Sequence, residues 1–259
     1  MFELLGIALE ELQFFLLIIA RISAMTFTLP IISANTIPLM FKAFLSIFIA
    51  IIVSSIVPPP SGLPVLFPIL GFMALKEVAV GLLIGLVAEF LFEAVKLAGF
   101  IIGRAMGLSM LTILDPNSEE SVDSVAQLSI FIATLFMLVM NTHHFLLDII
   151  FKSFYLIPLT EGMFNDQILR HTIEMSTQIF IIGLKIGAPL IVFLFMEKVI
   201  VAVFAKFSPD LHIIIISLPL SLLMGFYLLM YYWSYFAYAW NIYFEMYQTQ
   251  VLTFLKLLH

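Results

Sequence analysis

Charged side chains inside long apolar runs are the residues of this sequence best placed to do chemistry. Each is costly to place in lipid, so each should face protein, water or an opposite charge. They are Arg21, Lys76, Glu77, Glu89, Lys185, Glu197 and Lys198. Opposite charges that are adjacent in sequence point to different helix faces, so their partners should lie on other helices or other subunits. Structural pairing or snorkelling, contact between subunits, and coupling to protons or ions all remain open readings.

Motifs for catalysis, metal binding and nucleotide binding are absent from the sequence. His144 and Asp148 share a helix face beside His143, but there is no HExxH motif and no further histidine at ligand spacing. Without cysteine, thiolate metal sites and iron–sulfur clusters are excluded. GxxxxGK[ST], the Rossmann glycine pattern and the GxSxG elbow are also missing. We therefore expect no enzyme activity, no cofactor and no metal.

The composition requires a solvent other than water for much of the surface. Apolar residues make up 63% of the 259 residues and charged residues 11%, whereas soluble domains carry about 25% charged residues. A soluble fold could not hide this much apolar surface. The net charge of −6 and the lack of a basic patch exclude nucleic acid as a partner. We expect a single membrane domain over residues 1–259 that contacts lipid.

Six apolar segments are long enough, or nearly so, to cross a bilayer as helices. They run from about Leu12 to Leu29, Leu39 to Val57, Leu66 to Phe92, Val125 to Leu147, Thr177 to Phe204 and Ile213 to Tyr235. None shows the period-two alternation of a membrane strand. The sequence therefore predicts an all-α, polytopic membrane protein with about six hydrophobic helices.

Glycines at a spacing of four mark faces where helices can approach closely. Three of them, Gly99, Gly103 and Gly107, would share one helix face. Two further pairs repeat the spacing: Gly81 with Gly85, and Gly183 with Gly187. Simple helix packing explains the two pairs, and it explains the triple as readily as a functional role does.

The glycine triple leads directly into two methionines, Met106 and Met110, and then into an Asp115-Pro116 turn. Methionine is flexible and apolar, so it can seal around irregular shapes. The pattern predicts a close-packed, glycine-rich helix that ends in a movable loop.

The C-terminal part of the chain is rich in aromatic residues. Two readings are open for Tyr231, Tyr232, Trp233, Tyr235, Tyr238 and Trp240: a belt at the membrane interface, or simple packing of one helix end at a membrane surface. Residues 241–259 then read as an amphipathic helix that lies on that surface or against a partner.

The order of these features resembles the FliR family, called SctT in injectisomes, over nearly the whole chain. Ala20-Arg21-Ile22-Ser23 followed by Leu29-Pro30 resembles the family's first helix and its exit. The glycine-spaced stretch from Gly81 to Pro116 is the most specific part. Ser208-Pro209-Asp210 through Leu218-Pro219 resembles the turn into the last hydrophobic helix.

The resemblance implies a subunit of the flagellar or type III export gate in the bacterial inner membrane, at the flagellar basal body. Its partners would be FliP-like and FliQ-like subunits, FlhB-like and FlhA-like export components, and exported unfolded proteins. Residues 1–173 would be a FliP-like part with a plug near 107–121. Residues 174–259 would be a FliQ-like helical hairpin with a C-terminal amphipathic helix.

Gating by an order–disorder change of the Gly107–Ser121 loop is the expected mechanism. A small secondary transporter is the alternative, because buried charges and helices interrupted by Pro or Gly also fit that class. A transporter should contain an inverted repeat, and the hydropathy shows no convincing one.

Overall fold

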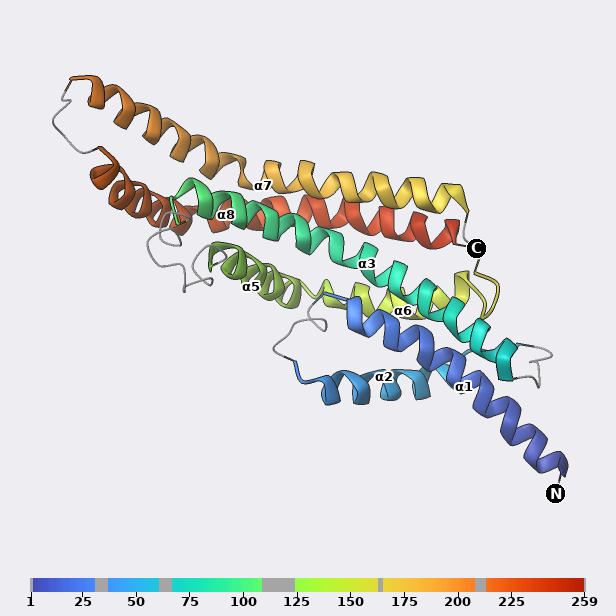
Figure 1. Ribbon diagram of the computed structural model, residues 1–259. Coiled ribbons are helices and arrows are strands. Elements are labelled where there is room, and N and C mark those ends of the chain that lie inside the picture. Colours follow the sequence, from blue (N-terminus) through green and yellow to red (C-terminus); the bar gives the residue numbers. More distant parts are fainter. Residues whose placement is uncertain are drawn as a thin grey trace. The chain divides into compact units, whose positions relative to one another are not determined.

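The computed structural model describes residues 2–30, 37–60, 67–108, 124–162, 165–207 and 213–258. Within these ranges all regular elements are helices, as Figure 1 shows. They are α1 (Phe2–Thr28), α2 (Leu39–Ser54), α3 (Phe67–Ala105), α5 (Ser124–Val139), α6 (His143–Leu156), α7 (Asp166–Phe207) and α8 (Ile213–Leu257). The predicted all-α, polytopic membrane fold is confirmed.

Four of these helices are long and apolar enough to cross a membrane. Their candidate spans are Glu10–Thr28, Pro68–Ala105, Asp166–Phe207 and Ser217–Leu257, and α5 with α6 would add a fifth if counted as one broken span. Helix α2 has 16 residues, about 24 Å, which is short of a hydrocarbon core of about 30 Å. The described residues thus hold more helices but fewer candidate spans than the six predicted segments.

The predicted segment 125–147 was wrong as one continuous helix. It divides into α5 and α6, and Asn141 at the break has a φ of 57°. A residue in the left-handed region cannot continue a right-handed helix, so the chain restarts at His143.

Two helices end later in the sequence than predicted. Helix α3 continues past Phe92 to Ala105. In that extension Lys96 and Glu93 lie one turn apart and pair on the helix surface, so the charges are compatible with helix. Helix α8 continues past Tyr235 to Leu257, so the predicted C-terminal helix is the end of one long element.

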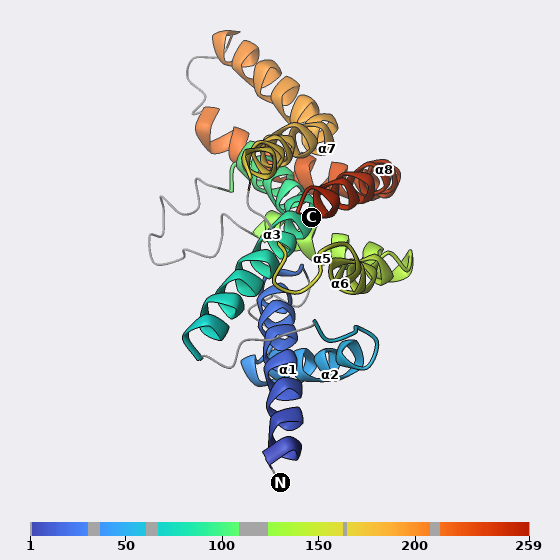
Figure 2. The same ribbon diagram turned by 90° about the vertical axis from the view of Figure 1, so that its right-hand side faces the viewer.

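The chain divides into two compact units, to both of which α3, α7 and α8 contribute residues. The first unit comprises residues 1–90, 141–176 and 247–259, and the second comprises residues 91–140 and 177–246. In the first unit, α2 crosses α1 (Figure 2) and packs against it, and the hydroxyls of Thr26 and Ser46 are 2.6 Å apart. Leu17, Ile18 and Ile22 of α1 are completely buried.

The core of the second unit is aromatic. Trp240 of α8 packs against Phe92 of α3 with ring centroids 5.5 Å apart, and Phe236 packs against Phe136 of α5 at 5.7 Å. The hydroxyl of Tyr232 donates a hydrogen bond to the carbonyl oxygen of Ile186 on α7, at 3.0 Å.

The predicted aromatic belt was therefore wrong for part of its members. Tyr232 and Trp240 are buried in the core, whereas Tyr231, Tyr235 and Tyr238 are exposed. The reason is helical spacing: residues four apart share a face, and the face that carries Tyr232, Phe236 and Trp240 is packed inside.

Candidate functional site

Helix α3 ends in a glycine-dependent stop. The amide of Gly107 donates to the carbonyl oxygen of Arg104 at 3.1 Å, and the amide of Leu108 donates to that of Gly103 at 3.1 Å. Gly107 has a φ of 88°. These two bonds and the left-handed glycine form a Schellman motif, which satisfies the last carbonyls of the helix. The spacing had predicted that Gly107 shares a helical face with Gly99 and Gly103. Gly107 instead lies beyond the end of the helix and does not share that face.

Met106, the residue before this stop, packs against α8. Met106 is completely buried. A Cβ at Gly225 would lie 2.5 Å from Met106 Cγ and 2.7 Å from its Cε, so a side chain there would displace the methionine. Leu218 of α8 lies beside Gly107, where an added Cβ would come within 2.9 Å of its Cδ1 atom. The end of α3 is thus clamped against α8.

The other predicted gate residues are Met110, Asp115 and Pro116. All three lie outside the described residues, as does the rest of the predicted loop beyond Leu108 up to residue 123. Their role as a plug remains a prediction from the sequence.

Glycines also bring α5 and α7 close to the C-terminal half of α3. A Cβ at Gly99 would lie 2.7 Å from Ala126 Cα and 2.8 Å from the carbonyl oxygen of Val125, both on α5. A Cβ at Gly183 of α7 would lie 2.8 Å from the carbonyl oxygen of Ala94. These are backbone contacts, so a side chain at either position would force the helices apart.

Two predicted packing glycines of this unit have other surroundings. A Cβ at Gly187 would lie 3.7 Å from Ala98 Cα, which is ordinary van der Waals contact, although it would also meet Ile191 Cδ1 at 3.0 Å. Gly103 is buried and supplies the carbonyl that Leu108 caps.

In the first unit, Gly81 and Gly85 bring α3 against α1. A Cβ at Gly81 would collide with the carbonyl oxygen of Arg21 and lie 2.9 Å from Ala24 Cβ. A Cβ at Gly85 would collide with the side chain of Thr28. This close approach places the buried side chain of Arg21 beside α3.

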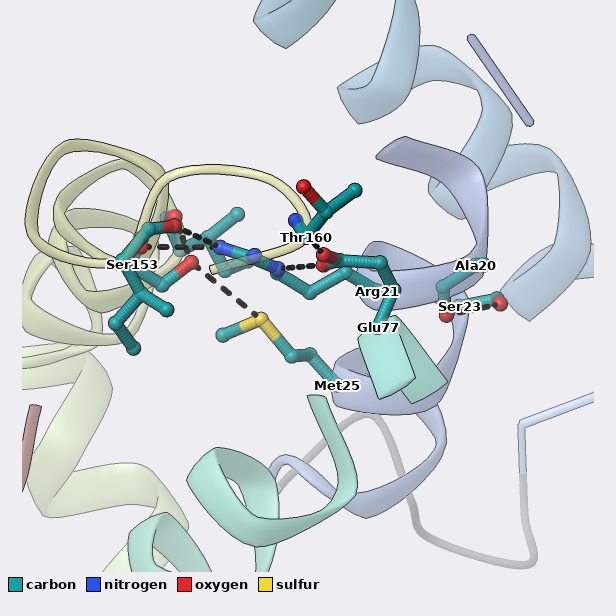
Figure 3. Close-up of polar contacts among 9 residues, drawn as sticks. Ala20, Arg21, Ser23, Met25, Glu77, Ser153 and Thr160 are labelled. Carbon is teal, nitrogen blue, oxygen red and sulfur yellow. Dashed lines mark hydrogen bonds and ion pairs between the residues drawn. The ribbon is translucent and has the colours of Figure 1, made fainter. Parts of the chain in front are cut away.

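Arg21 is the centre of a buried polar cluster that joins three helices (Figure 3). Its Nε donates to Glu77 Oε2 of α3, and both side chains are excluded from solvent. Its Nη1 donates to the carbonyl oxygens of Ser153, at 3.0 Å, and Ile157, at 2.8 Å, at the C-terminal end of α6. Arg21, which belongs to α1, thereby caps the C-terminal end of α6. The negative end of the α6 dipole also favours its positive charge.

The cluster extends to the turn after α6. The amide of Thr160 donates to Glu77 Oε1 at 2.7 Å, and Thr160 itself has a φ of 74°. The guanidinium carbon of Arg21 lies 4.6 Å from the centre of the Phe154 ring, a cation–π contact. Arg21 Nη2 has no hydrogen-bond partner within the described part of the chain. Each carboxylate oxygen of Glu77 is satisfied, which is what makes a buried charge tolerable.

The remaining intramembrane charges do not join this cluster. Glu197 of α7 is buried, and Ser221 of α8 donates to its Oε2 atom at 2.8 Å. Lys76 and Glu89 are half-buried. Lys185 and Lys198 are exposed on α7.

The two histidines at the start of α6 pack ring against ring. The rings of His143 and His144 are 4.3 Å apart, and Asp148 pairs with Lys152 at 2.6 Å. Within the described ranges, no three His, Cys, Asp or Glu side chains are grouped so that they could hold a metal ion.

Sequence reasoning missed several residues on which these contacts depend. They are Ser153, Phe154, Ser221 and Gly225. Gly225 interrupts an apolar run and could have been noticed as a close-approach position. The carbonyls of Ser153 and Ile157 carry no side-chain signal at all.

Comparison with known proteins gives one consistent match. Residues 12–247 match the family described as bacterial export proteins, family 1. The chain is similar to the flagellar biosynthetic protein FliR of Bacillus subtilis (strain 168), with 32% identity over 218 residues, 83% of this chain and 84% of the relative. It is 29% identical over 205 residues to that of Escherichia coli (strain K12), which covers 79% and 78%. It is 27% identical over 150 residues to the Yop proteins translocation protein T of Yersinia pestis, which covers 56% and 57%.

Proposed function

This chain belongs to the bacterial export proteins of family 1, and on that premise we propose that it is a non-enzymatic, channel-forming subunit of a flagellar protein-export apparatus. It would assemble with FliP-like and FliQ-like subunits in the bacterial inner membrane, at the flagellar basal body. FlhB-like and FlhA-like components would contact that assembly. Unfolded export substrates would pass through the channel that it helps to build.

The observation that carries this proposal is the length of the exposed apolar surface on α7. Large apolar side chains are exposed from Leu169, at 61%, through Phe180, at 62%, to Phe207, at 79%. That stretch is about 57 Å of helix. A hydrocarbon core of about 30 Å covers only about 39 Å of a helix tilted by 40°. The remainder needs cover from protein, which sister subunits would provide.

The gate in this proposal is the segment from Gly107 to Ser121, most of which lies outside the described residues. Support comes from its anchor: Gly107 stops α3, and Met106 is fixed against Gly225 of α8. A segment that starts from a fixed helix end can alternate between two arrangements without moving the helices behind it. Energy for gating would come from elsewhere in the machine.

Co-purification tests the assembly. Full-length chain expressed with FliP-like and FliQ-like subunits should be recovered as one complex from detergent extracts. Gly99→Leu should reduce recovery of the complex, because the leucine would meet the backbone of α5. Gly103→Leu should do the same if the glycine-rich helix is as closely packed as its sequence predicts. Gly71→Leu in the same helix is the matched control, because a Cβ there meets nothing within 4 Å.

Recovery of the wild-type chain alone, with neither partner, would contradict the proposal. Ion flux tests the gate separately: deletion of residues 115–119 should make the reconstituted assembly leak ions. A tight assembly after that deletion would refute the plug while leaving assembly intact. Transport of a small solute by the isolated chain in liposomes would instead favour a secondary transporter.

A further inference from the structure

A pocket of about 390 Å³ opens on the second unit, apart from the clamped end of α3. Residues of three helices line it: Glu93, Lys96, Leu97 and Phe100 of α3, Ala126 of α5, and Ile179 and Phe180 of α7. The glycine contacts explain why it exists. Gly99 allows α5 to pack closely against α3, and Gly183 allows α7 to do the same. The pocket is the space that remains between α5 and α7.

The pocket is amphipathic. Its walls are apolar apart from Glu93 and Lys96, whose charged atoms are 2.9 Å apart and whose side chains are about half exposed. The guanidinium carbon of Arg104 lies 5.4 Å from the ring centre of Phe100, so a second cation borders the same wall. Residues 93, 96, 97, 100 and 104 recur at spacings of three and four along α3, so they form one stripe.

The charges on this stripe select the kind of molecule that fits. Over residues 93–104, all of which the structure describes, the stripe carries Glu93, Lys96 and Arg104, and so a net charge of +1 beside an apolar cavity. An apolar peptide side chain that filled the cavity would satisfy the apolar walls but would leave that charge uncompensated. An anionic amphiphile matches both parts, because its chain occupies the apolar space and its phosphate meets the cations.

We propose that this pocket binds an anionic phospholipid, with part of an acyl chain between Leu97, Ile179 and Phe180 and the phosphate held by Lys96 and Arg104. Lys96 exchanges its contact with Glu93 for the phosphate, so Glu93 weakens binding of the lipid. This binding site is independent of how the chain gates export.

Lipid retention tests the proposal. The full-length chain is reconstituted in nanodiscs of phosphatidylcholine and phosphatidylglycerol in equal amounts, released into detergent, and analysed by native mass spectrometry. The wild type should retain one phosphatidylglycerol in preference to phosphatidylcholine. Lys96→Gln and Arg104→Gln should each reduce the retained phosphatidylglycerol about fivefold. Glu93→Gln should increase it, which a merely structural role of the ion pair does not predict.

Two further variants separate the lipid from general surface charge. Lys152→Gln is the matched control, because Lys152 also forms a half-exposed ion pair on a helix, with Asp148, but borders no part of this pocket. It should leave retention unchanged. Ile179→Trp should fill the cavity and displace the lipid although both cations remain. Equal retention by the wild type and the Lys96→Gln/Arg104→Gln double variant, or equal retention of the two lipids by the wild type, would overturn the proposal.

Discussion

The N-terminal and C-terminal halves of α3 both meet neighbouring helices through glycines, but they complete those contacts differently. Against α1, the close approach at Gly81 and Gly85 is accompanied by a buried charge cluster. In this cluster Arg21 donates hydrogen bonds to Glu77 and to two carbonyls at the end of α6. Against α5 and α7, the approach at Gly99 and Gly183 is made of backbone atoms and the side chains of Ser129 and Leu97, without a buried ion pair among the described residues. The first contact depends on charge and direction, whereas the second depends on shape.

This difference predicts different responses to substitution. A polar cluster fails as a unit, because removal of one member leaves the others buried without partners. A glycine contact fails in proportion to the volume that is added. Substitutions in the two halves of α3 can therefore separate the two kinds of contact.

Removal of Arg21 should have the largest effect. Arg21→Ala leaves Glu77 as an uncompensated buried charge and two carbonyls of α6 without donors, and should cost about 3–5 kcal/mol of stability. Thermal unfolding of the purified chain in detergent micelles, followed by circular dichroism, measures the loss. Lys152→Gln removes an exposed pair and should change stability by less than about 1 kcal/mol.

The double variant Arg21→Met/Glu77→Leu sharpens that result. Because it removes both charges together, it should be more stable than Arg21→Ala. The remaining loss should come from the two carbonyls and the Thr160 amide, which no longer have partners. A double variant that is no more stable than Arg21→Ala would show that the charge on Glu77 is not the source of the cost.

An alanine at Gly99 should have an intermediate effect. Gly99→Ala adds one methyl group against the α5 backbone and should cost about 1–3 kcal/mol in the same assay. Gly71→Ala should be neutral or slightly stabilising, since its Cβ meets open space and alanine favours helix. Equal effects at the two positions would show that close approach of α5 is not what Gly99 provides.

Gly107 should show the smallest of the three effects on stability. Gly107→Ala keeps the chain length but places a Cβ in the left-handed region, at a cost of about 1–2 kcal/mol. Gly107→Asn should cost less, because asparagine tolerates that conformation better. If both variants unfold at the wild-type temperature, the helix does not depend on this stop.

The sequence was informative about helices and small residues because these depend on local chemistry. Apolar runs and glycine spacing predicted the helical membrane fold and the positions where helices approach closely. The spacing could not say which neighbour each glycine meets. Nor could it separate Gly107, which stops α3, from Gly103, which lies within it, since both sit at intervals of four.

The cluster around Arg21 shows where sequence reasoning reaches its limit. The cost of a buried charge predicts that Arg21 and Glu77 need partners on other elements. It does not identify them, because Arg21 could pair with any of the carboxylates in the apolar runs. Two acceptors of Arg21 are backbone carbonyls that exist at every residue, and only the fold selects Ser153 and Ile157.

The seat of Met106 on Gly225 has a chemical consequence. The thioether is completely buried and lies against Gly225 of α8, so an oxidant should reach it only when α3 and α8 separate. Met40 on α2 is 73% exposed and should oxidise freely. The rate of sulfoxide formation at Met106 relative to Met40 therefore measures how often the C-terminal end of α3 separates from α8.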